Sequence, residues 1–286
     1  MNPLTFSFDA MGSVWKITLW DHVTPEIREA IIQQARSFED TYSRFKKTSW
    51  LSSLTNHMGI VKIPRDFFEI LIFYKKLYTL SEKKCTPLIG SVLDDLGYDR
   101  EYSLIAKKNI SEPPDFDEAV AIIDESTIEL KKNVSFDIGA IGKGYVIDII
   151  SNFLRIQGCE RFLVDGSGDL LYQGKGEEIR VGLEDPKDFE KSIGVVTLPD
   201  GALCGSGGNR RAWGVYHHIV DPLSLDSPKN ILATWVRARS ALLADGLATA
   251  LFLCDPENFL KDFSFEYCIL NDDYRVKRSA GFSAEL

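Results

Sequence analysis

The stretch Leu242-Leu-Ala-Asp-Gly-Leu-Ala-Thr-Ala-Leu-Phe252 predicts a buried helix, because apolar residues fill nearly all of its positions. Asp245 and Thr249 interrupt this run four residues apart, which places both side chains on one helical face, roughly 6 Å apart. A carboxylate buried there is unfavourable unless it is paired or binds a cation. Two explanations stay open: a local hydrogen bond or salt bridge, or two oxygen ligands for a hard cation such as Mg²⁺.

The composition is that of an ordinary soluble globular protein, with 44% hydrophobic and 26% charged residues among 286. The net charge of -9 argues against nucleic acid or an anionic membrane as the main partner. The N-terminus has no signal-peptide pattern, no run reaches transmembrane length, and the five scattered cysteines form no CxxC pair. We therefore expect reduced thiols, no membrane span and a cytoplasmic location.

Predicted strands and helices are mixed along the whole chain. Apolar alternation predicts strands, and a 3.6-residue periodicity predicts helices. The strands are expected within residues 4–20, 127–130, 161–174, 179–183, 193–198, 231–238 and 265–277, and the helices over 25–45, 67–81, 119–123, 146–154 and 242–252. Since no repeat or linker divides the chain, we expect one α+β domain with a mixed or antiparallel sheet and packed helices, over residues 4–280.

Two glycine-containing segments and a histidine pair are candidates for chemistry. Residues 135–145, Ser-Phe-Asp-Ile-Gly-Ala-Ile-Gly-Lys-Gly-Tyr, predict a strand, a turn and a helix, which indicates either an anion site or a turn needed for packing. The P-loop pattern is absent, because Gly144 stands where Ser or Thr is needed. Residues 203–211 predict a second small-residue turn, with two arginines. In the extended segment that follows, at most one of His217 and His218 enters a given site, and a purely structural role for His218 stays open.

In this order, the segments resemble the FAD:protein FMN transferase family, the ApbE-type flavin transferases. The resemblance covers about residues 5–270. The matching stretches are Met11-Gly12-Ser13, Tyr42-Ser-Arg-Phe-x-x-x-Ser, Asp137-Ile-Gly-Ala-Ile-Gly-Lys-Gly-Tyr, Val164-Asp-Gly-Ser-Gly-Asp, Ser206-Gly207, His218-Ile-Val-Asp-Pro222 and Ala244-Asp-Gly-Leu-Ala-Thr249.

The resemblance implies an α+β fold with FAD in a cleft and Mg²⁺ at its pyrophosphate. The metal would be held by Asp245, Thr249 and the backbone carbonyl of Ala140. The residues expected to contact the flavin nucleotide are Met11, Phe45, Lys84, Cys85, Thr86, Asp137, Lys143 and Ile219.

The reaction implied by the resemblance is phosphoryl transfer, in which a Ser or Thr hydroxyl of an acceptor protein attacks the FMN-side phosphorus of FAD and AMP leaves. His218 is the expected base, and Asp221 either orients it or supports the metal site. The family's usual Phe-Asp is Cys85-Thr86 here, and the Thr-Gly that usually follows Asp221-Pro222 is missing. Two alternatives stay open: a Mg²⁺-dependent FAD pyrophosphatase, and a flavin-binding protein without catalysis.

Overall fold

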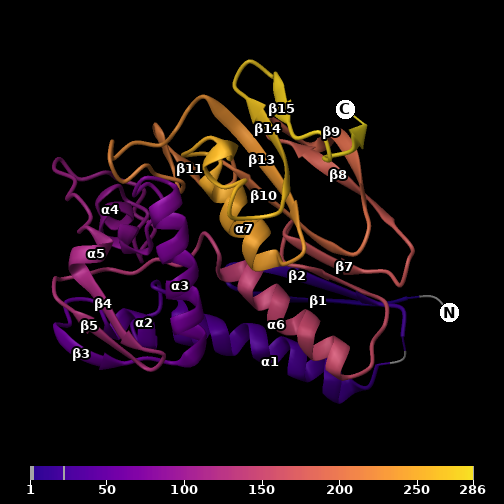
Figure 1. Cartoon of the computed structure of the whole chain (residues 1–286), viewed down its shortest axis with the longest axis horizontal. Helices are drawn as coiled ribbons and strands as arrows, with labels where there is room; N and C mark the ends of the chain where they lie inside the picture. Colours follow the sequence, from indigo (N-terminus) through magenta and orange to yellow (C-terminus); the bar gives the residue numbers. More distant parts are fainter. Residues whose placement is uncertain (1–2, 22, 286) are drawn as a thin grey trace.

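The computed structural model describes residues 3–21 and 23–285, and its centre is a large antiparallel sheet. The strands of this sheet are β1 (Leu4–Ala10), β2 (Ser13–Leu19), β6 (Phe162–Asp165), β7 (Leu170–Gln173), β10 (Gly201–Gly207), β13 (Ile231–Ala238), β14 (Glu266–Asn271) and β15 (Val276–Arg278). They lie in the order β1-β2-β6-β7-β10-β13-β14-β15 (Figure 1), so that β10 is hydrogen-bonded to β7 and β13.

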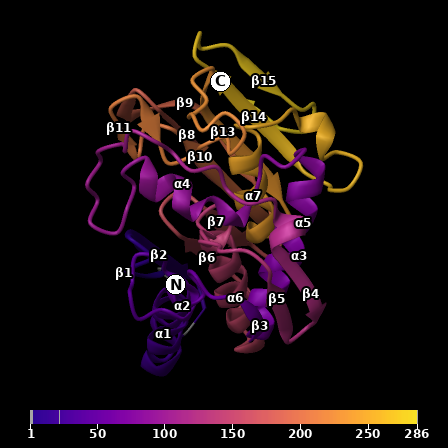
Figure 2. The ribbon, with the colours of Figure 1, turned by 90° about the vertical axis from the view of Figure 1, so that its left-hand side faces the viewer.

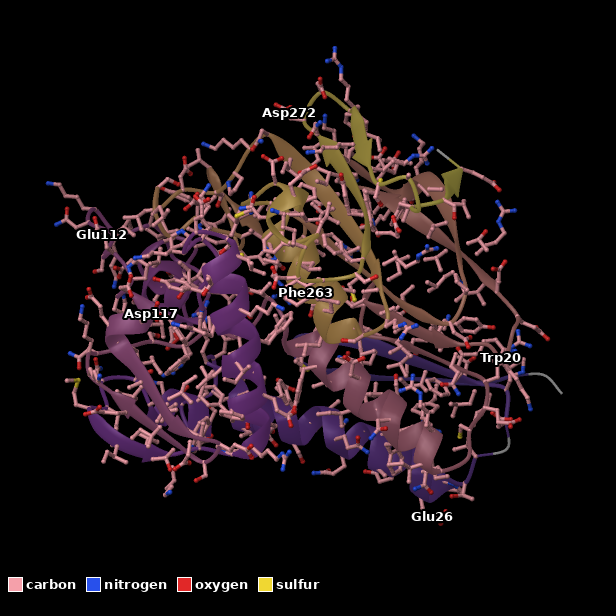
Figure 3. All side chains as sticks on the ribbon, viewed as in Figure 1. Trp20, Glu26, Glu112, Asp117, Phe263 and Asp272 are labelled. Atoms are coloured by element: carbon pink, nitrogen blue, oxygen red, sulfur yellow. The ribbon has the colours of Figure 1, made fainter. Side chains whose placement is uncertain are left out.

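Helices cover one face of this sheet. They are α1 (Pro25–Tyr42), α6 (Gly142–Ile156) and α7 (Ala241–Ala250), with α3 (Arg65–Leu80) beside them (Figure 1). Side chains fill the space between the layers (Figure 3). In β2, Trp15 and Ile17 are fully buried whereas Lys16 between them is exposed, which is the alternation expected for a strand with one buried face. Ile147 and Ile150 of α6 are buried in the same core.

A second, three-stranded sheet packs on the other face of the main sheet. It consists of β16 (Ala284–Glu285), β9 (Asp188–Leu198) and β8 (Ile179–Asp185). β10 shows how both faces are buried, because Ala202 and Cys204 belong to the core under the helices while Leu203 belongs to the core under β8 and β9. The molecule therefore has three layers, and β10 contributes to both interfaces between them.

A smaller sheet lies at one end of the molecule, next to α3 (Figures 1 and 2). Its strands are β3 (Gly59–Lys62), β5 (Thr127–Leu130) and β4 (Val120–Asp124), in that order. The remaining short elements are α2 (Trp50–Ser53), η1 (Pro87–Ile89), α4 (Gly90–Asp95), α5 (Phe116–Ala119), β11 (Ala212–Trp213), β12 (Tyr216–His217) and η2 (Pro256–Asn258).

The predicted fold class is confirmed, but one predicted helix is too long and another is a strand. The first helix ends at Tyr42 rather than Phe45, because Ser43 has an extended backbone. The helix predicted over 119–123 is wrong, since residues 120–124 form β4 and pair with β5. Val120 and Ile122 are β-branched and favour a strand when a partner is available. The extent of a single domain over residues 4–280 stays a prediction.

Two further segments differ from their predictions. Ser135 and Asp137 belong to no sheet, because their backbone groups bond to the turn at 87–90 instead, Asp137 N to Pro87 O and Gly90 N to Ser135 O. Of the turn predicted over 203–211, residues 203–207 belong to β10, and the turn begins only at Gly208. The five cysteines are free thiols. Within residues 3–21 and 23–285, none of the helices has the length and apolar character needed to cross a bilayer.

Candidate functional site

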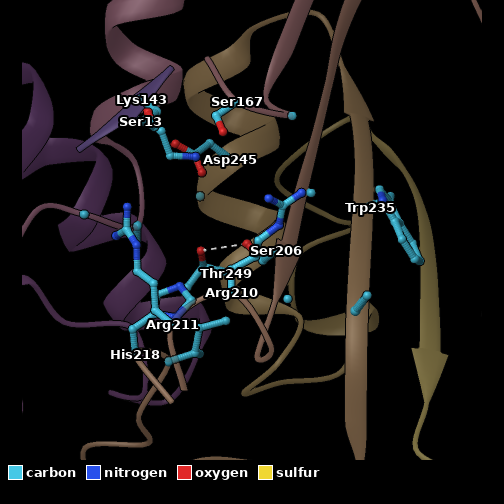
Figure 4. Close-up of a pocket in the computed structure, with 18 of the residues that line it drawn as sticks. Ser13, Lys143, Ser167, Ser206, Arg210, Arg211, His218, Trp235, Asp245 and Thr249 are labelled. Atoms are coloured by element: carbon cyan, nitrogen blue, oxygen red, sulfur yellow. Dashed lines mark hydrogen bonds between the residues drawn. The ribbon is translucent and has the colours of Figure 1, made fainter. Parts of the chain in front are cut away.

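A cavity of about 630 Å³ lies where β10, β13 and α7 meet the segments around residues 84–98, 137–143 and 205–220 (Figure 4). Its volume is within the range of small-molecule sites. All but one of the residues predicted to act in catalysis or to bind nucleotide or metal line this cavity. They are Phe45, Lys84, Cys85, Thr86, Asp137, Ala140, Lys143, His218, Ile219, Asp245 and Thr249.

Met11 is the exception, since Gly12 and Ser13 line the cavity but Met11 does not. Met11 is in the left-handed backbone region, with φ of 54°, and its backbone N–H donates to Glu39 of α1 over 3.0 Å. The turn between β1 and β2 is thereby tied to α1. A role for Met11 in nucleotide binding stays a prediction.

The first turn of α7 is fixed by α6. The Asp148 carboxylate of α6 accepts hydrogen bonds from the backbone N–H groups of Ala241 and Leu242 and from the Ser240 hydroxyl, each 2.9 Å long. Ser240 also caps the helix by accepting from Leu243 N. These bonds satisfy backbone donors that a helix start leaves without intrahelical partners, and they set the position of Asp245 one turn later.

Asp245 is 4% exposed and accepts one hydrogen bond, 2.8 Å from Gly144 N to its Oδ2. Burial raises the pKa of this carboxyl. In the described part of the chain no Lys or Arg forms an ion pair with it, and Thr249 bonds to the Ser206 hydroxyl at 3.2 Å instead (Figure 4). The structure therefore shows neither the local Asp–Thr hydrogen bond nor the salt bridge considered above. Within the described residues, Asp245 Oδ1 has no hydrogen-bond partner.

The donor set at this point fits a hard cation. Asp245 and Thr249 offer a carboxylate and a hydroxyl, and Ala140 lines the same cavity. Oxygen donors of this kind suit Mg²⁺, which retains water and phosphate oxygens as its other ligands. The described residues hold no cluster of three or more His, Cys, Asp or Glu, so a metal here would depend on non-carboxylate oxygens as well.

Of the two adjacent histidines, His218 lines the cavity and His217 does not. The His217 ring lies 2.8 Å from the carbonyl oxygen of Pro228 and packs near Phe252, so its role is structural. His218 Nδ1 is buried without a hydrogen-bond partner in the described structure. Burial, together with the nearby Arg211, lowers the pKa of His218 to about 3. The ring is therefore neutral at neutral pH, and so low a pKa makes it a weak proton acceptor in the absence of a ligand.

Asp137 is held by Arg44, a residue that sequence reasoning did not single out. The Arg44 guanidinium is buried and donates to Asp137, to Asp94 at 2.7 Å and to the carbonyl of Tyr98 at 2.6 Å. It also lies 4.3 Å from the centre of the Phe45 ring. The signal was available, because Arg44 belongs to the Tyr42-Ser-Arg-Phe stretch, but nothing in the sequence indicated its carboxylate partners.

Lys143 is paired with Asp169, which was also missed. Asp169 is 1% exposed and further accepts from Gly205 N at 3.2 Å. It is the last residue of the Asp-Gly-Ser-Gly-Asp stretch, which forms the turn between β6 and β7. Lys143 is thus fixed at the cavity wall by a buried carboxylate, a contact that its predicted role did not include.

The remaining predicted residues form the wall at 84–86. Lys84 Nζ donates to Leu253 O at 3.2 Å and lies 3.8 Å from the Asp221 carboxylate. Asp221 has no hydrogen bond to His218 among the described contacts, so the orienting role suggested for it is not observed. Burial raises the pKa of the Cys85 thiol to about 12, which keeps it protonated. Thr86 caps η1 by accepting from Leu88 N.

The chain is similar to known proteins in sequence and in fold. A model described as the ApbE family matches residues 11–265. Over 238 residues the chain is 26% identical to the FAD:protein FMN transferase of Vibrio cholerae serotype O1, covering 76% of this chain and 70% of that protein. It is 28% identical over 233 residues to the FAD:protein FMN transferase of Treponema pallidum, and this match covers 68% of this chain and 62% of that protein. The crystal structure of the ApbE protein from Thermotoga maritima MSB8 is similar, with a TM-score of 0.87 and 21% sequence identity, and the match covers 98% of each chain. At this identity the similarity shows a shared fold.

Proposed function

Because the chain belongs to the ApbE family, we propose that it is a flavin transferase that moves the FMN part of FAD onto a hydroxyl of an acceptor protein. The family expected from the sequence is confirmed. The two relatives compared above are both named FAD:protein FMN transferases. The observation that carries the proposal is the meeting of Asp245, Thr249 and His218 at one cavity. Phosphoryl transfer needs charge neutralisation and a proton acceptor in the same place.

In the proposed reaction the oxygen of an acceptor Ser or Thr forms a bond to the FMN-side phosphorus of FAD. The bridging P–O bond breaks, and its electron pair leaves on the phosphate of AMP. The neutral ring of His218 takes the proton of the attacking hydroxyl. Negative charge on a bound pyrophosphate would raise the pKa of His218 and so make it a stronger base in the complex.

The chain's own residues orient the other participants. Mg²⁺ held by Asp245, Thr249 and the carbonyl of Ala140 would neutralise charge on the pyrophosphate. Gly144 N and the Ser206 hydroxyl fix the side chains of Asp245 and Thr249. Phe45 and Ile219 give the cavity apolar surface, against which a flavin ring can pack.

The proposal is tested by incubating the protein with FAD, Mg²⁺ and a set of candidate acceptor proteins, then measuring intact and peptide masses. We expect one acceptor to gain the mass of FMN on a Ser or Thr, with release of an equal amount of AMP. EDTA and an acceptor whose modified Ser or Thr is replaced by Ala are the controls. Release of FMN and AMP at the same rate without acceptor would identify a pyrophosphatase instead. FAD that stays intact throughout would identify a binding protein.

A further inference from the structure

The cations that line the cavity differ in whether they already have partners. Three of the four are paired: Lys143 with Asp169, Lys84 with Asp221, and Arg210 with Glu184. For the fourth, Arg211, no ion pair or hydrogen bond to the guanidinium exists within residues 3–21 and 23–285. In a protein with a net charge of -9, a cation at a cavity wall without an anionic partner indicates a site that receives an anion from outside.

Arg211 lies beside the two groups on which the proposed reaction depends. Its backbone carbonyl accepts from His218 N at 3.1 Å. Its positive charge adds to the effect of burial in lowering the pKa of His218, and it opposes the rise that burial causes in the pKa of Asp245. In Figure 4, Arg211 and His218 lie together on one side of the pocket, while Arg210 extends to the other side. The guanidinium therefore belongs to the same cavity wall as His218, the proposed proton acceptor.

The backbone that carries Arg211 is firmly anchored, which suits a residue that must hold a fixed position. Two residues later, Trp213 Nε1 donates to Leu96 O at 2.8 Å, and its ring stacks on Tyr98 with centroids 5.5 Å apart. Trp213 also pairs with Tyr216 in the two-stranded ladder of β11 and β12. The loop is therefore held by buried side-chain and backbone contacts close to the arginine.

We propose that Arg211 binds the non-bridging oxygens of the FMN-side phosphate, the phosphate that the acceptor hydroxyl attacks, and stabilises its charge in the transition state. This inference rests on the proposed function. Arg211 stays protonated throughout, while the acceptor O–P bond forms, the bridging P–O bond breaks and AMP takes the electron pair. A planar guanidinium suits two phosphate oxygens at once, whereas Lys143 is a point charge already paired with Asp169.

The test compares Arg211→Ala and Arg211→Lys with Arg180→Ala. Arg180 is an exposed arginine of β8 that pairs with Glu285 and does not line the cavity. We expect Arg211→Ala to lower the kcat of FMN transfer by about 10²- to 10³-fold. Arg211→Lys should recover part of the loss, because it restores the positive charge but not the paired N–H donors of the guanidinium. Arg180→Ala should leave kcat unchanged. Equal urea midpoints would show that the variants remain folded.

Equilibrium binding of FMN, riboflavin and AMP separates a phosphate contact from a structural role. Arg211→Ala should weaken binding of FMN by about tenfold or more, because a charge-assisted hydrogen bond is lost, and leave riboflavin binding unchanged. Equal losses for FMN and riboflavin, or no loss for either, would overturn the inference. A loss confined to AMP would place Arg211 on the other phosphate and would also overturn it.

Failure of the proposed function and failure of the Arg211 inference would give different results. If the wild-type protein transfers no FMN to any acceptor, the proposed function fails, and the comparison of FMN with riboflavin still decides whether Arg211 contacts phosphate. If the wild-type protein transfers FMN and Arg211→Ala does so at the same rate, the inference alone is wrong.

Discussion

A Cβ atom added to Gly144 would lie 2.2 Å from the backbone carbonyl oxygen of Ala241 and 2.8 Å from Cβ of Asp245. Helices α6 and α7 are therefore in backbone contact at this point, closer than any side chain permits. The same proximity allows Gly144 N to reach the Asp245 carboxylate. Of the two roles considered for the glycine-rich turn, the packing role is thus demonstrated for Gly144.

Gly144→Ala should destabilise the protein by about 1–3 kcal/mol, because the added methyl group forces the two helices apart. The free energy of unfolding in urea measures the effect. Gly182→Ala is the matched control, since its Cβ would meet Ser192 at an ordinary 3.5 Å. If both substitutions cost the same, the helix contact is not the cause.

His218→Asn should lower the rate of FMN transfer by about 10²- to 10⁴-fold, because it removes the proposed proton acceptor. Binding of FAD, measured by quenching of flavin fluorescence, should persist. His57→Ala, at an exposed position outside the cavity, serves as control for loss of an imidazole. Transfer at the wild-type rate in His218→Asn would assign the base to another group.

Stability should depend on pH through the same ring. The pKa of His218 is lowered to about 3, mainly by burial, from 6.5 in an unfolded chain. The charged and titratable groups facing it are Arg211, His217, Lys143 and Asp137. Between these two pKa values the unfolded state binds more protons, so the free energy of unfolding falls as the pH is lowered. Urea unfolding at about pH 7 and pH 4 should show a larger loss for the wild type than for His218→Asn.

Asp245→Asn should weaken Mg²⁺ binding at least about tenfold, because one of the few charged oxygens is lost. The readout is the rise in Tm on adding Mg²⁺ with FAD, which we expect for the wild type and not for this variant. Asp272→Asn is the control, at an exposed position that does not line the cavity (Asp272 is labelled in Figure 3). An unchanged Mg²⁺ response in Asp245→Asn would place the metal elsewhere.

Arg44→Met should cost about 1–3 kcal/mol, because the partly exposed Asp137 carboxylate would lose a charge-assisted hydrogen bond. Adding Asp137→Asn to this variant should recover part of the stability, which a double-mutant cycle in urea would measure. Arg65→Ala, which breaks an exposed pair with Glu69, should change stability by less than about 1 kcal/mol. Independent, additive losses for Arg44 and Asp137 would show that the pair is not coupled.

Local patterns were sufficient for elements whose burial follows their own periodicity. The α7 helix was predicted from an almost continuous apolar run, and it is buried on nearly all sides. The β1 and β2 strands were predicted from apolar alternation, because each buries one face. β4 was predicted as a helix because its strand character depends on pairing with β5. Likewise, residues 135–137 have strand-like composition, but their backbone bonds go to the turn at Pro87.

The sequence was sufficient to identify individual residues of the candidate site. It was not sufficient to identify the side chains that pair with them. Asp245 and Thr249 stood out because they are polar within one apolar run. The partner of Lys143, Asp169, is brought there by the turn between β6 and β7, and no spacing rule connects the two residues. Arg211 was noted only as one of two arginines, and its lack of an anionic partner becomes visible only when Arg210 is seen paired with Glu184.

The Asp148 carboxylate of α6 accepts hydrogen bonds from backbone N–H groups at the start of α7. These bonds hold the glycine-rich turn, which leads into α6, and the helix that carries Asp245 in a fixed relative position. A ligand that enters the cavity therefore meets a wall whose backbone is already fixed. Asp148 acts on this wall without lining the cavity, so its loss would release the start of α7 and, with it, the carboxylate of Asp245.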